Sequence, residues 1–168
     1  MAAVKTKNTG RKKPGNPYLS VLLPVYNEEE SLDLQYKAVI NALAGLKKSF
    51  EIIFVNDGST DRSAGILRSI AAADKRVKVV NFRRNFGQTA AMAAGIDYSS
   101  GEVLVFMDSD LQNEPGDIMK LLDKIEEGYD VVSGWRKNRQ DKLISRKIPS
   151  RIANRLISRV TGVPLHDL

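Results

Sequence analysis

Two aspartates stand one residue apart at the end of an apolar run, in the stretch EVLVFMDSDLQNEP at residues 102–115. Carboxylates this close repel each other unless a cation or a proton lies between them. The chain has no cysteine and a single histidine, which excludes thiolate sites and disfavours a histidine-based zinc site. Any metal must therefore be held mainly by oxygen ligands, and such ligands favour Mg²⁺ or Mn²⁺. We therefore interpret Asp108 and Asp110 as ligands of a divalent cation that carries a nucleotide diphosphate. The alternative is that both are solvated turn or capping residues.

Further polar residues follow two other apolar runs. Asp57, in VNDGST, has the chemistry to accept a hydrogen bond from the imide N–H of a nucleobase, or it only starts the next helix through an Asx turn. In PVYNEEE, Tyr26 is placed to flank a base, and Asn27 and Glu28 to contact base or ribose. Capping of the following helix explains Asn27 and the acidic residues equally well.

Arginines and amides supply candidate anion contacts. The stretch RRNFGQ at 83–88 precedes a helical pattern, and helix starts bind anions well, so Gln88 and its neighbours are candidates. Arg136 is a second candidate for a phosphate contact. Exposed arginines are usually only solvated, so each of these signals is weak alone.

Alternating strands and helices are expected to position these residues. Five apolar runs rich in Val, Ile and Phe do not alternate cleanly with polar residues, which is typical of strands buried on both faces of a parallel sheet. They cover 18–25, 50–56, 76–82, 102–108 and 130–134. Helical patterns lie between them, the first capped by Asn27. The pattern predicts an α/β three-layer sandwich with right-handed crossovers. Ligands bind beyond the carboxyl ends of such strands, where all the polar residues above lie.

The two ends of the chain differ from this core, which we assign to residues 18–141. Residues 1–17 are basic, contain Gly and Pro and lack apolar periodicity, so we expect a disordered tail. In residues 142–160, isoleucine, leucine and valine recur every four residues beside Lys and Arg, which predicts a basic amphipathic helix. Such a helix either lies on an anionic membrane surface or packs on the domain. No aromatic interleaving supports nucleic-acid binding, and we expect none.

Four stretches together resemble family 2 glycosyltransferases with the GT-A fold, a Rossmann-like sandwich with a mainly parallel sheet. They are LSVLLPVYNEEESL, EIIFVNDGSTDRS, RRNFGQTAAMAAGID and GEVLVFMDSDLQNEPGDIMKLL. More narrowly, they are similar to the polyprenyl-phosphate branch, which includes dolichyl-phosphate mannosyltransferases and undecaprenyl-phosphate glycosyltransferases. The resemblance covers roughly residues 18–168. The family pattern normally continues further, so we expect residues 142–168 to begin an acceptor-side region of a truncated chain.

The resemblance implies a role for each matching residue. The nucleoside pocket would be lined by Pro24, Tyr26, Glu28 and Asp57, with Gln88 and Arg136 near the nucleotide. Asp108, Asp110 and Gln112 would surround the metal and the diphosphate, with Asp110 and Gln112 as the direct ligands. Asp167 would lie near the acceptor phosphate and orient it.

These expectations combine into an inverting transferase that uses Mg²⁺ or Mn²⁺. A UDP- or GDP-sugar is the expected donor and a polyprenyl phosphate the expected acceptor, at the cytoplasmic face of a membrane. The helix at 142–160 would contact anionic headgroups, and segments absent here would anchor the full-length protein. One alternative is a family 2 transferase with a soluble or polysaccharide acceptor. The other is a non-catalytic fragment that binds nucleotide or docks on membranes.

Overall fold

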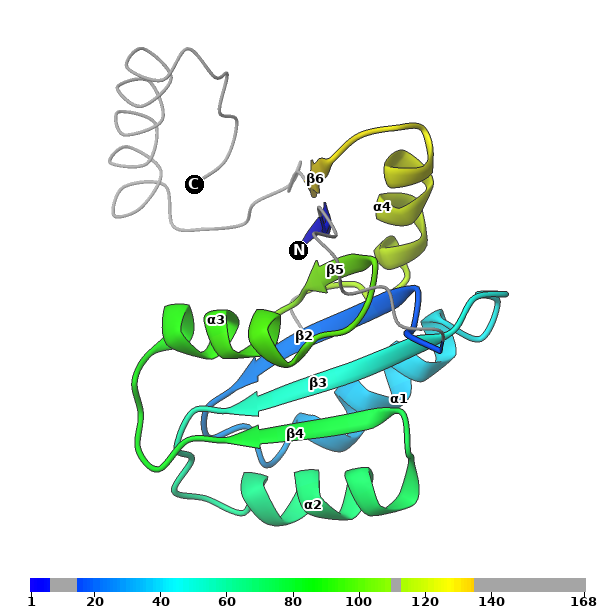
Figure 1. Cartoon of the computed structure of the whole chain (residues 1–168). Coiled ribbons are helices and arrows are strands. Elements are labelled where there is room, and N and C mark those ends of the chain that lie inside the picture. Colours follow the sequence, from blue (N-terminus) through cyan, green and yellow to red (C-terminus); the bar gives the residue numbers. More distant parts are fainter. Residues whose placement is uncertain (7–14, 110–112, 135–168) are drawn as a thin grey trace, which may run out of the picture. The chain divides into compact units, whose positions relative to one another are not determined.

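The structure is a computed structural model that describes residues 1–6, 15–109 and 113–134. A six-stranded sheet in the order β4-β3-β2-β5-β1-β6 forms its centre (Figure 1). The strands are β1 (Ala2–Lys5), β2 (Leu19–Val25), β3 (Phe50–Asn56), β4 (Val77–Asn81), β5 (Val103–Phe106) and β6 (Val131–Ser133). The helices are α1 (Leu32–Ala42), α2 (Ser63–Ala73), α3 (Gln88–Tyr98) and α4 (Asp117–Glu126).

Four neighbouring strands run parallel, as the apolar runs predict. β2 pairs in parallel with β3 on one side and with β5 on the other, and β3 pairs in parallel with β4. A helix follows each of these four strands, because parallel neighbours need a crossover connection. The predicted α/β sandwich with a mainly parallel sheet is confirmed.

Strand β1 corrects the prediction of a disordered tail over its first residues. Ala2–Lys5 pairs antiparallel with both β5 and β6 and lies inside the sheet. Ala3 is fully buried in the main core cluster, where a small apolar residue fills the space under α4. Four residues without helical or alternating periodicity carry little local signal, so the strand arises from pairing with a distant segment. Residues 7–14 of the predicted tail lie outside the described part.

Two hydrophobic cores lie on opposite faces of the sheet. The larger cluster joins α1, α2 and α4 to alternate strand residues such as Val21 and Phe54. The smaller one lies under α3 and contains Leu22, Ile53 and Val55. Figure 1 shows α3 across the sheet from α1 and α2. Helix α3 consists largely of small residues, which lets its backbone approach the sheet closely: a Cβ at Gly95 would be in ordinary contact with Leu22 and Val55. The core therefore holds the carboxyl ends of β2, β3 and β5 side by side.

Helix α1 begins later than the sequence predicts. Its first residue is Leu32, and Ser31 rather than Asn27 occupies the position before it. Asn27 adopts a left-handed backbone conformation with φ of 55°. Its side chain accepts hydrogen bonds from the backbone N–H of Thr60 (2.8 Å) and from the hydroxyl of that residue (3.3 Å). The prediction of Asn27 as the N-cap was wrong because a contact between loops uses its side chain instead.

Glu51, near the amino end of β3, carries a buried carboxylate that has a structural explanation. Glu51 Oε1 accepts hydrogen bonds from the Ser20 hydroxyl and the Ser100 backbone N–H, both at 2.7 Å. Lys78 Nζ lies 2.5 Å from Glu51 Oε2. Every oxygen of this carboxylate is thus paired, as burial of a charge requires.

In the described part of the chain, no helix has the length and apolar character needed to cross a bilayer.

Candidate functional site

A cavity of about 460 Å³ opens where β2, β3 and β5 end. Ten residues line it: Pro24, Val25, Tyr26, Glu28, Asp57, Asn85, Gly87, Gln88, Asp108 and Ser109. They come from the end of β2, from the start of α3 and from the connections after β2, β3, β4 and β5, all at the same edge of the sheet. Six of them are residues that the sequence singled out as nucleotide contacts. The convergence predicted from the strand ends is therefore present in the fold.

Asp57 is buried and organises the loop after β4. Its exposed fraction is 4%. Asp57 Oδ1 accepts the backbone N–H of Phe86 at 2.7 Å, and Oδ2 accepts that of Gly87 at 2.9 Å. A carboxylate has about four acceptor positions, so two lone pairs remain for a ligand. Asp57 thus shapes the cavity wall and keeps acceptor capacity toward the cavity.

Gly58 brings the same loop into close contact with the turn after β3. Gly58 has a φ of +69°, a conformation that residues with a side chain rarely adopt. A Cβ at this position would overlap the carbonyl carbon of Arg84 and lie 2.5 Å from the backbone nitrogen of Asn85. The glycine is therefore required by both its backbone angle and its backbone neighbours.

Asp108 is held by two amide side chains. Gln88 Nε2 donates to Asp108 Oδ1 at 2.9 Å, and Asn113 Nδ2 donates to Asp108 Oδ2 at 3.2 Å. The hydroxyl of Ser109 donates to the Pro24 carbonyl at 2.8 Å, which ties the end of β5 to the end of β2. These contacts fix the direction of the Asp108 carboxylate at the cavity.

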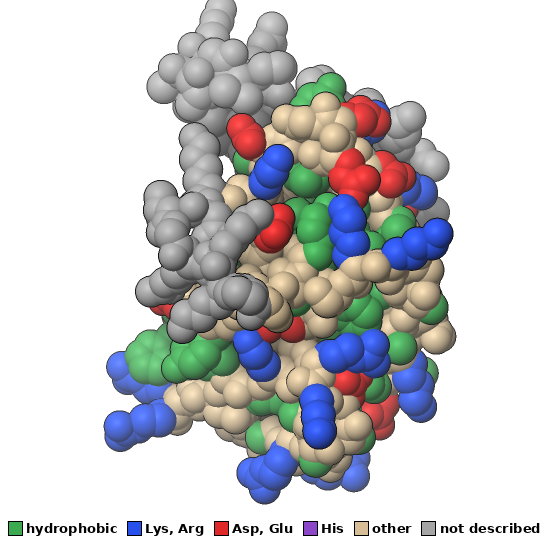
Figure 2. Space-filling view, turned by 45° about the vertical axis from the view of Figure 1, so that its right-hand side comes forward, with side chains coloured by type: hydrophobic (Ala, Val, Ile, Leu, Met, Phe, Trp, Pro, Cys, Tyr) green, Lys and Arg blue, Asp and Glu red, His purple; other side chains and the backbone are tan. Residues whose placement is uncertain are grey.

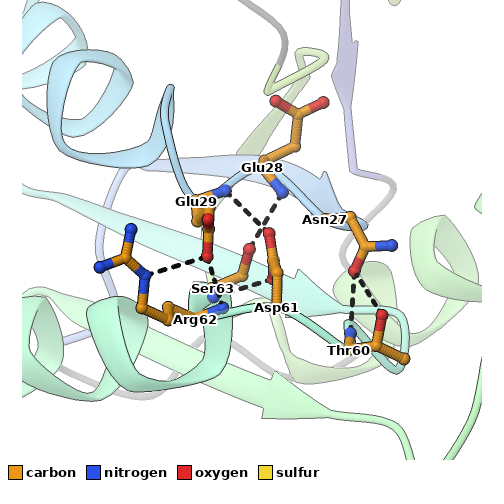
Figure 3. A network of polar contacts seen from close by, with 7 residues as sticks. All are labelled: Asn27, Glu28, Glu29, Thr60, Asp61, Arg62 and Ser63. Atoms are coloured by element: carbon orange, nitrogen blue, oxygen red, sulfur yellow. Dashed lines mark hydrogen bonds and ion pairs between the residues drawn. The ribbon is translucent and has the colours of Figure 1, made fainter.

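The turn after β2 and the turn after β3 are bonded to each other (Figure 3). The Glu28 backbone N–H donates to the Ser63 hydroxyl, and the Glu29 backbone N–H donates to Asp61 Oδ2. In return, Glu29 Oε2 accepts the backbone N–H of Arg62 at 2.8 Å and its side-chain Nε–H at 3.2 Å. The two turns thus form one unit that carries Tyr26, Glu28 and Asp57.

The electrostatics of this unit follow its hydrogen bonds. The backbone N–H and then the guanidinium of Arg62 lower the pKa of Glu29. Partial burial opposes ionisation of Asp61, but hydrogen bonds from Ser63 and from the Glu29 backbone outweigh it and lower the pKa of Asp61. Both carboxylates are therefore ionised at neutral pH and are engaged in holding the turns together.

The chemistry of the cavity suits a hard divalent cation in one respect. Asp108 keeps free lone pairs beside its two amide donors, and carboxylate oxygens are ligands that Mg²⁺ and Mn²⁺ prefer. Within residues 1–6, 15–109 and 113–134, no three His, Cys, Asp or Glu side chains gather closely enough to hold a metal alone. A cation at Asp108 would therefore take further ligands from other oxygen groups, such as water, a bound diphosphate or residues 110–112.

Several predicted site residues lie outside the described part of the chain. These are Asp110, Gln112, Arg136 and Asp167, together with the helix expected at 142–160. In contrast, the contribution of Asn113 was missed. Its position five residues after Asp108 was the available signal, but an asparagine shortly before a helix is more commonly a capping residue. Ser109 was also missed, because a serine between two aspartates is typical of a turn.

Comparison with known proteins agrees with this geometry. Residues 20–167 match the model of the family described as Glycosyl transferase family 2. A dodecaprenyl-phosphate galacturonate synthase from Rhizobium johnstonii is 45% identical over 151 residues, which is 89% of this chain and 45% of that protein. An undecaprenyl-phosphate 4-deoxy-4-formamido-L-arabinose transferase from Pseudomonas paraeruginosa is 44% identical over 150 residues, 89% of this chain and 44% of that protein. The chain spans less than half the length of these curated relatives.

Solved structures show the same fold. TarS from S. aureus matches with a TM-score of 0.52 and 25% identity, over 66% of this chain and 32% of that one. The mannosyltransferase PcManGT from Pyrobaculum calidifontis, solved with GDP-Man and Mn²⁺, matches with a TM-score of 0.56 over 66% of this chain and 32% of that one. Its identity of 21% supports the fold alone. The predicted GT-A fold is confirmed, and with a family model that matches nearly the whole sequence, the chain belongs to glycosyl transferase family 2.

Proposed function

We propose that this chain is the donor-binding part of an inverting glycosyltransferase that moves a sugar from a nucleotide-diphosphate sugar to a polyprenyl phosphate. The observation that carries the proposal is the cavity at the carboxyl edge, which combines Asp57 with Asp108. The relatives support the acceptor class, because both of those named above are polyprenyl-phosphate enzymes by name.

The nucleoside binds in the part of the cavity lined by Pro24, Tyr26, Glu28 and Asp57. Tyr26 is half exposed and flanks the base, and a lone pair of Asp57 accepts an imide N–H. The imide N3–H of uracil and the lactam N1–H of guanine are both suitable donors to a carboxylate, so this contact suits UDP and GDP alike. The 25% identical TarS has been solved with UDP, which favours testing UDP first.

The diphosphate lies toward Asp108 and Gln88. We assign the cation site to Asp108, Asp110 and Gln112, with Mg²⁺ or Mn²⁺ as the cation and Asp110 and Gln112 as direct ligands. When bound, the cation would neutralise the charge that grows on the departing diphosphate. Gln88 and Asn113 keep the Asp108 carboxylate aligned, and Arg136 adds a positive charge near the phosphates.

Transfer inverts the configuration of the sugar. A phosphate oxygen of the acceptor attacks the anomeric carbon, and the bond from that carbon to the diphosphate oxygen breaks on the opposite face. A phosphate monoester is already anionic at neutral pH, so no strong general base is required. Asp167 orients the acceptor in this scheme. The acceptor is a lipid, so the reaction takes place at a membrane surface, on its cytoplasmic face, with the helix at 142–160 against anionic headgroups.

Calorimetric titration with UDP and with GDP, each with and without Mn²⁺, tests the donor site. We expect one nucleotide to bind in a Mn²⁺-dependent manner, and Asp108→Asn to remove most of the Mn²⁺ dependence while the protein stays folded by circular dichroism. Asp117→Asn, at the exposed start of α4, is the matched control and should bind as the unaltered chain does. If neither nucleotide binds a folded protein under any of these conditions, the donor-site assignment fails.

A further inference from the structure

The loop after β4 presents a continuous exposed surface beside the cavity. Arg83, Arg84, Asn85 and Phe86, which we call the rim loop, are all exposed, and Phe86 has an exposed fraction of 55%. The backbone of this loop is nevertheless firmly held, by the hydrogen bond from Phe86 to Asp57 and by its close contact with Gly58. The fold therefore fixes a large apolar side chain in water instead of burying it.

The ring of Phe86 is supported from its own loop. The ring of Phe82 meets it edge to face at a centroid distance of 5.5 Å. The guanidinium carbon of Arg84 lies 4.8 Å from the Phe86 ring centroid. Asn85 and Gly87 line the cavity whereas Phe86 does not, so the aromatic ring lies on the outer side of the cavity wall. The exposed ring of Phe86 therefore lies beside the cavity and not in it.

The charge of the rim loop differs from that of the opposite edge of the sheet. Figure 2, turned toward the right-hand side of Figure 1, shows basic and acidic side chains interspersed. In the connections that precede β3 and β4, Lys48 pairs with Glu126 at 2.6 Å and Arg76 with Asp74 at 2.8 Å, and each cation also lies over an aromatic ring. Among the described residues, neither Arg83 nor Arg84 forms an ion pair. The rim loop thus combines an exposed aromatic ring with two arginines that no carboxylate of the described residues pairs.

We propose that the rim loop is a membrane contact, in which Phe86 enters the headgroup region of an anionic lipid bilayer and Arg83 and Arg84 meet lipid phosphates. Aromatic side chains favour the membrane interface, basic residues next to an anionic leaflet are attracted to it, and long arginine side chains reach from an apolar contact to a phosphate. The inference rests on the proposed function, because a lipid acceptor requires the cavity mouth to face the bilayer.

A single tryptophan provides a local test. The only tryptophan of the chain is Trp135, so Trp135→Phe combined with Phe86→Trp gives one reporter at the rim loop. The matched control combines Trp135→Phe with Tyr98→Trp, since Tyr98 is an equally exposed aromatic residue at the far end of α3. Both proteins are mixed with vesicles of brominated phosphatidylcholine and phosphatidylglycerol in equal parts. We expect quenching of the tryptophan at position 86 and none at position 98.

The other outcomes each overturn the proposal. No quenching at position 86, equal quenching at both positions, or equal quenching by vesicles of brominated phosphatidylcholine alone would contradict a specific anionic membrane contact at the rim loop. A change in emission at position 86 on addition of UDP or GDP, with none on addition of vesicles, would assign Phe86 to the donor site. Calorimetric nucleotide binding by the same variant shows independently whether the donor site has formed, so the two proposals fail separately.

The charge contribution is tested by vesicle sedimentation of otherwise unaltered protein. Arg84→Ala should weaken binding to phosphatidylglycerol-containing vesicles about fivefold, the factor expected for one basic residue at an anionic surface. Arg68→Ala removes the same charge from an exposed position on α2 and is the matched control. Equal losses from both variants would indicate that only net charge matters, which would overturn the role of the rim loop.

Discussion

At the scale of single residues, the site depends on amides that hold carboxylates. Asp108 has an amide donor on each oxygen, from Gln88 and from Asn113. A neutral amide fixes the direction of a carboxylate without cancelling its charge, whereas an arginine or lysine at the same place would compete with a cation for it. This arrangement leaves Asp108 both aligned and negatively charged.

Asn113→Leu should therefore weaken Mn²⁺ affinity in the presence of nucleotide about tenfold, the lower end of the usual cost of losing a partner that orients a residue of a metal site. Asn113 is nearly buried and does not line the cavity, so metal-free nucleotide binding should change far less. Titration calorimetry at several Mn²⁺ concentrations separates the two effects. Asn41→Leu, on the exposed side of α1, is the control. Equal losses with and without Mn²⁺ would assign Asn113 to general folding instead.

A buried glutamine offers a test of stability. Gln35 on α1 is fully buried, its Nε2 lies 3.6 Å from the sulfur of Met107, and its Oε1 has no hydrogen-bond partner among the described residues. Gln35→Met keeps the shape and removes the unpaired oxygen, so we expect the free energy of unfolding in urea to rise by about 1 kcal/mol. Gln35→Glu should instead destabilise the fold by burying a charge. A loss of stability in Gln35→Met would point to a bound water as the missing partner.

Acid sensitivity should come in part from Asp74. Three hydrogen bonds from the Arg76 guanidinium, at 2.8, 3.0 and 3.2 Å, lower the pKa of Asp74. The folded pKa is then below the unfolded one, near 4. The resulting stabilisation is present above about pH 4 and disappears as the pH falls through the folded pKa. Asp74→Asn should lower the midpoint of urea unfolding more at pH 7 than at pH 2. An equal decrease at both values would show that charge is not the cause.

At the scale of elements, two turns and one loop form the donor site as a unit. Asp57 and Gly58 hold the loop after β4, and Asp61 and Ser63 hold the turn after β2. Of these contacts, only that of Ser63, the first residue of α2, comes from a regular helix or strand. The cavity walls are thus positioned by hydrogen bonds between connections that are distant in sequence.

Gly58→Ala should loosen this unit. The new methyl group would overlap the backbone of Arg84 and require an unfavourable φ, so we expect a loss of about 2–4 kcal/mol in unfolding free energy. Nucleotide affinity should fall as well, because Asn85 and Gly87 would move. Gly65→Ala is the matched control: this glycine lies inside α2 with open space around its Cβ position, and the change should stabilise by about 0.5–1 kcal/mol. Similar effects of the two variants would refute the role of the close contact.

The limits of sequence-based prediction follow from the same contacts. Strands β2 and β3 were predicted to within one residue, because doubly buried strands need continuous apolar runs. The convergence of Asp57 and Asp108 was predicted because parallel strands end at one edge. The start of α1 was not predicted correctly. Asn27 accepts a hydrogen bond from Thr60, 33 positions away, instead of capping its own helix. The structural use of Asp57 was also not predicted, because its partners are backbone groups that carry no residue signature.

At the scale of the whole molecule, the chain start completes the sheet beside the site. Among the described strands, β6 pairs only with β1, and β1 pairs with β5 through Ala2 to Lys5. The family match begins at residue 20, so β1 lies outside it. No local pattern predicts that a short segment pairs with a strand about a hundred residues away. β5, in contrast, also pairs with β2, so it has a partner that does not depend on β1.

Ala3→Asp tests whether β1 is a separable part of the fold. Position 3 is fully buried in the core, so an unpaired carboxylate there costs folding free energy. Dissociation of β1 from the sheet would avoid this cost. We expect hydrogen exchange to accelerate in β1 and β6 and over the face of α4 that contacts them, while β2 and β3 keep their protection. Lys5→Glu, an exposed change in the same strand, should leave these rates nearly unaltered.

Since β2 still holds β5, Mn²⁺-dependent nucleotide binding should persist in Ala3→Asp. Uniformly faster exchange across all strands would mean that β1 is instead integral to the cooperative core, and that the donor site depends on it.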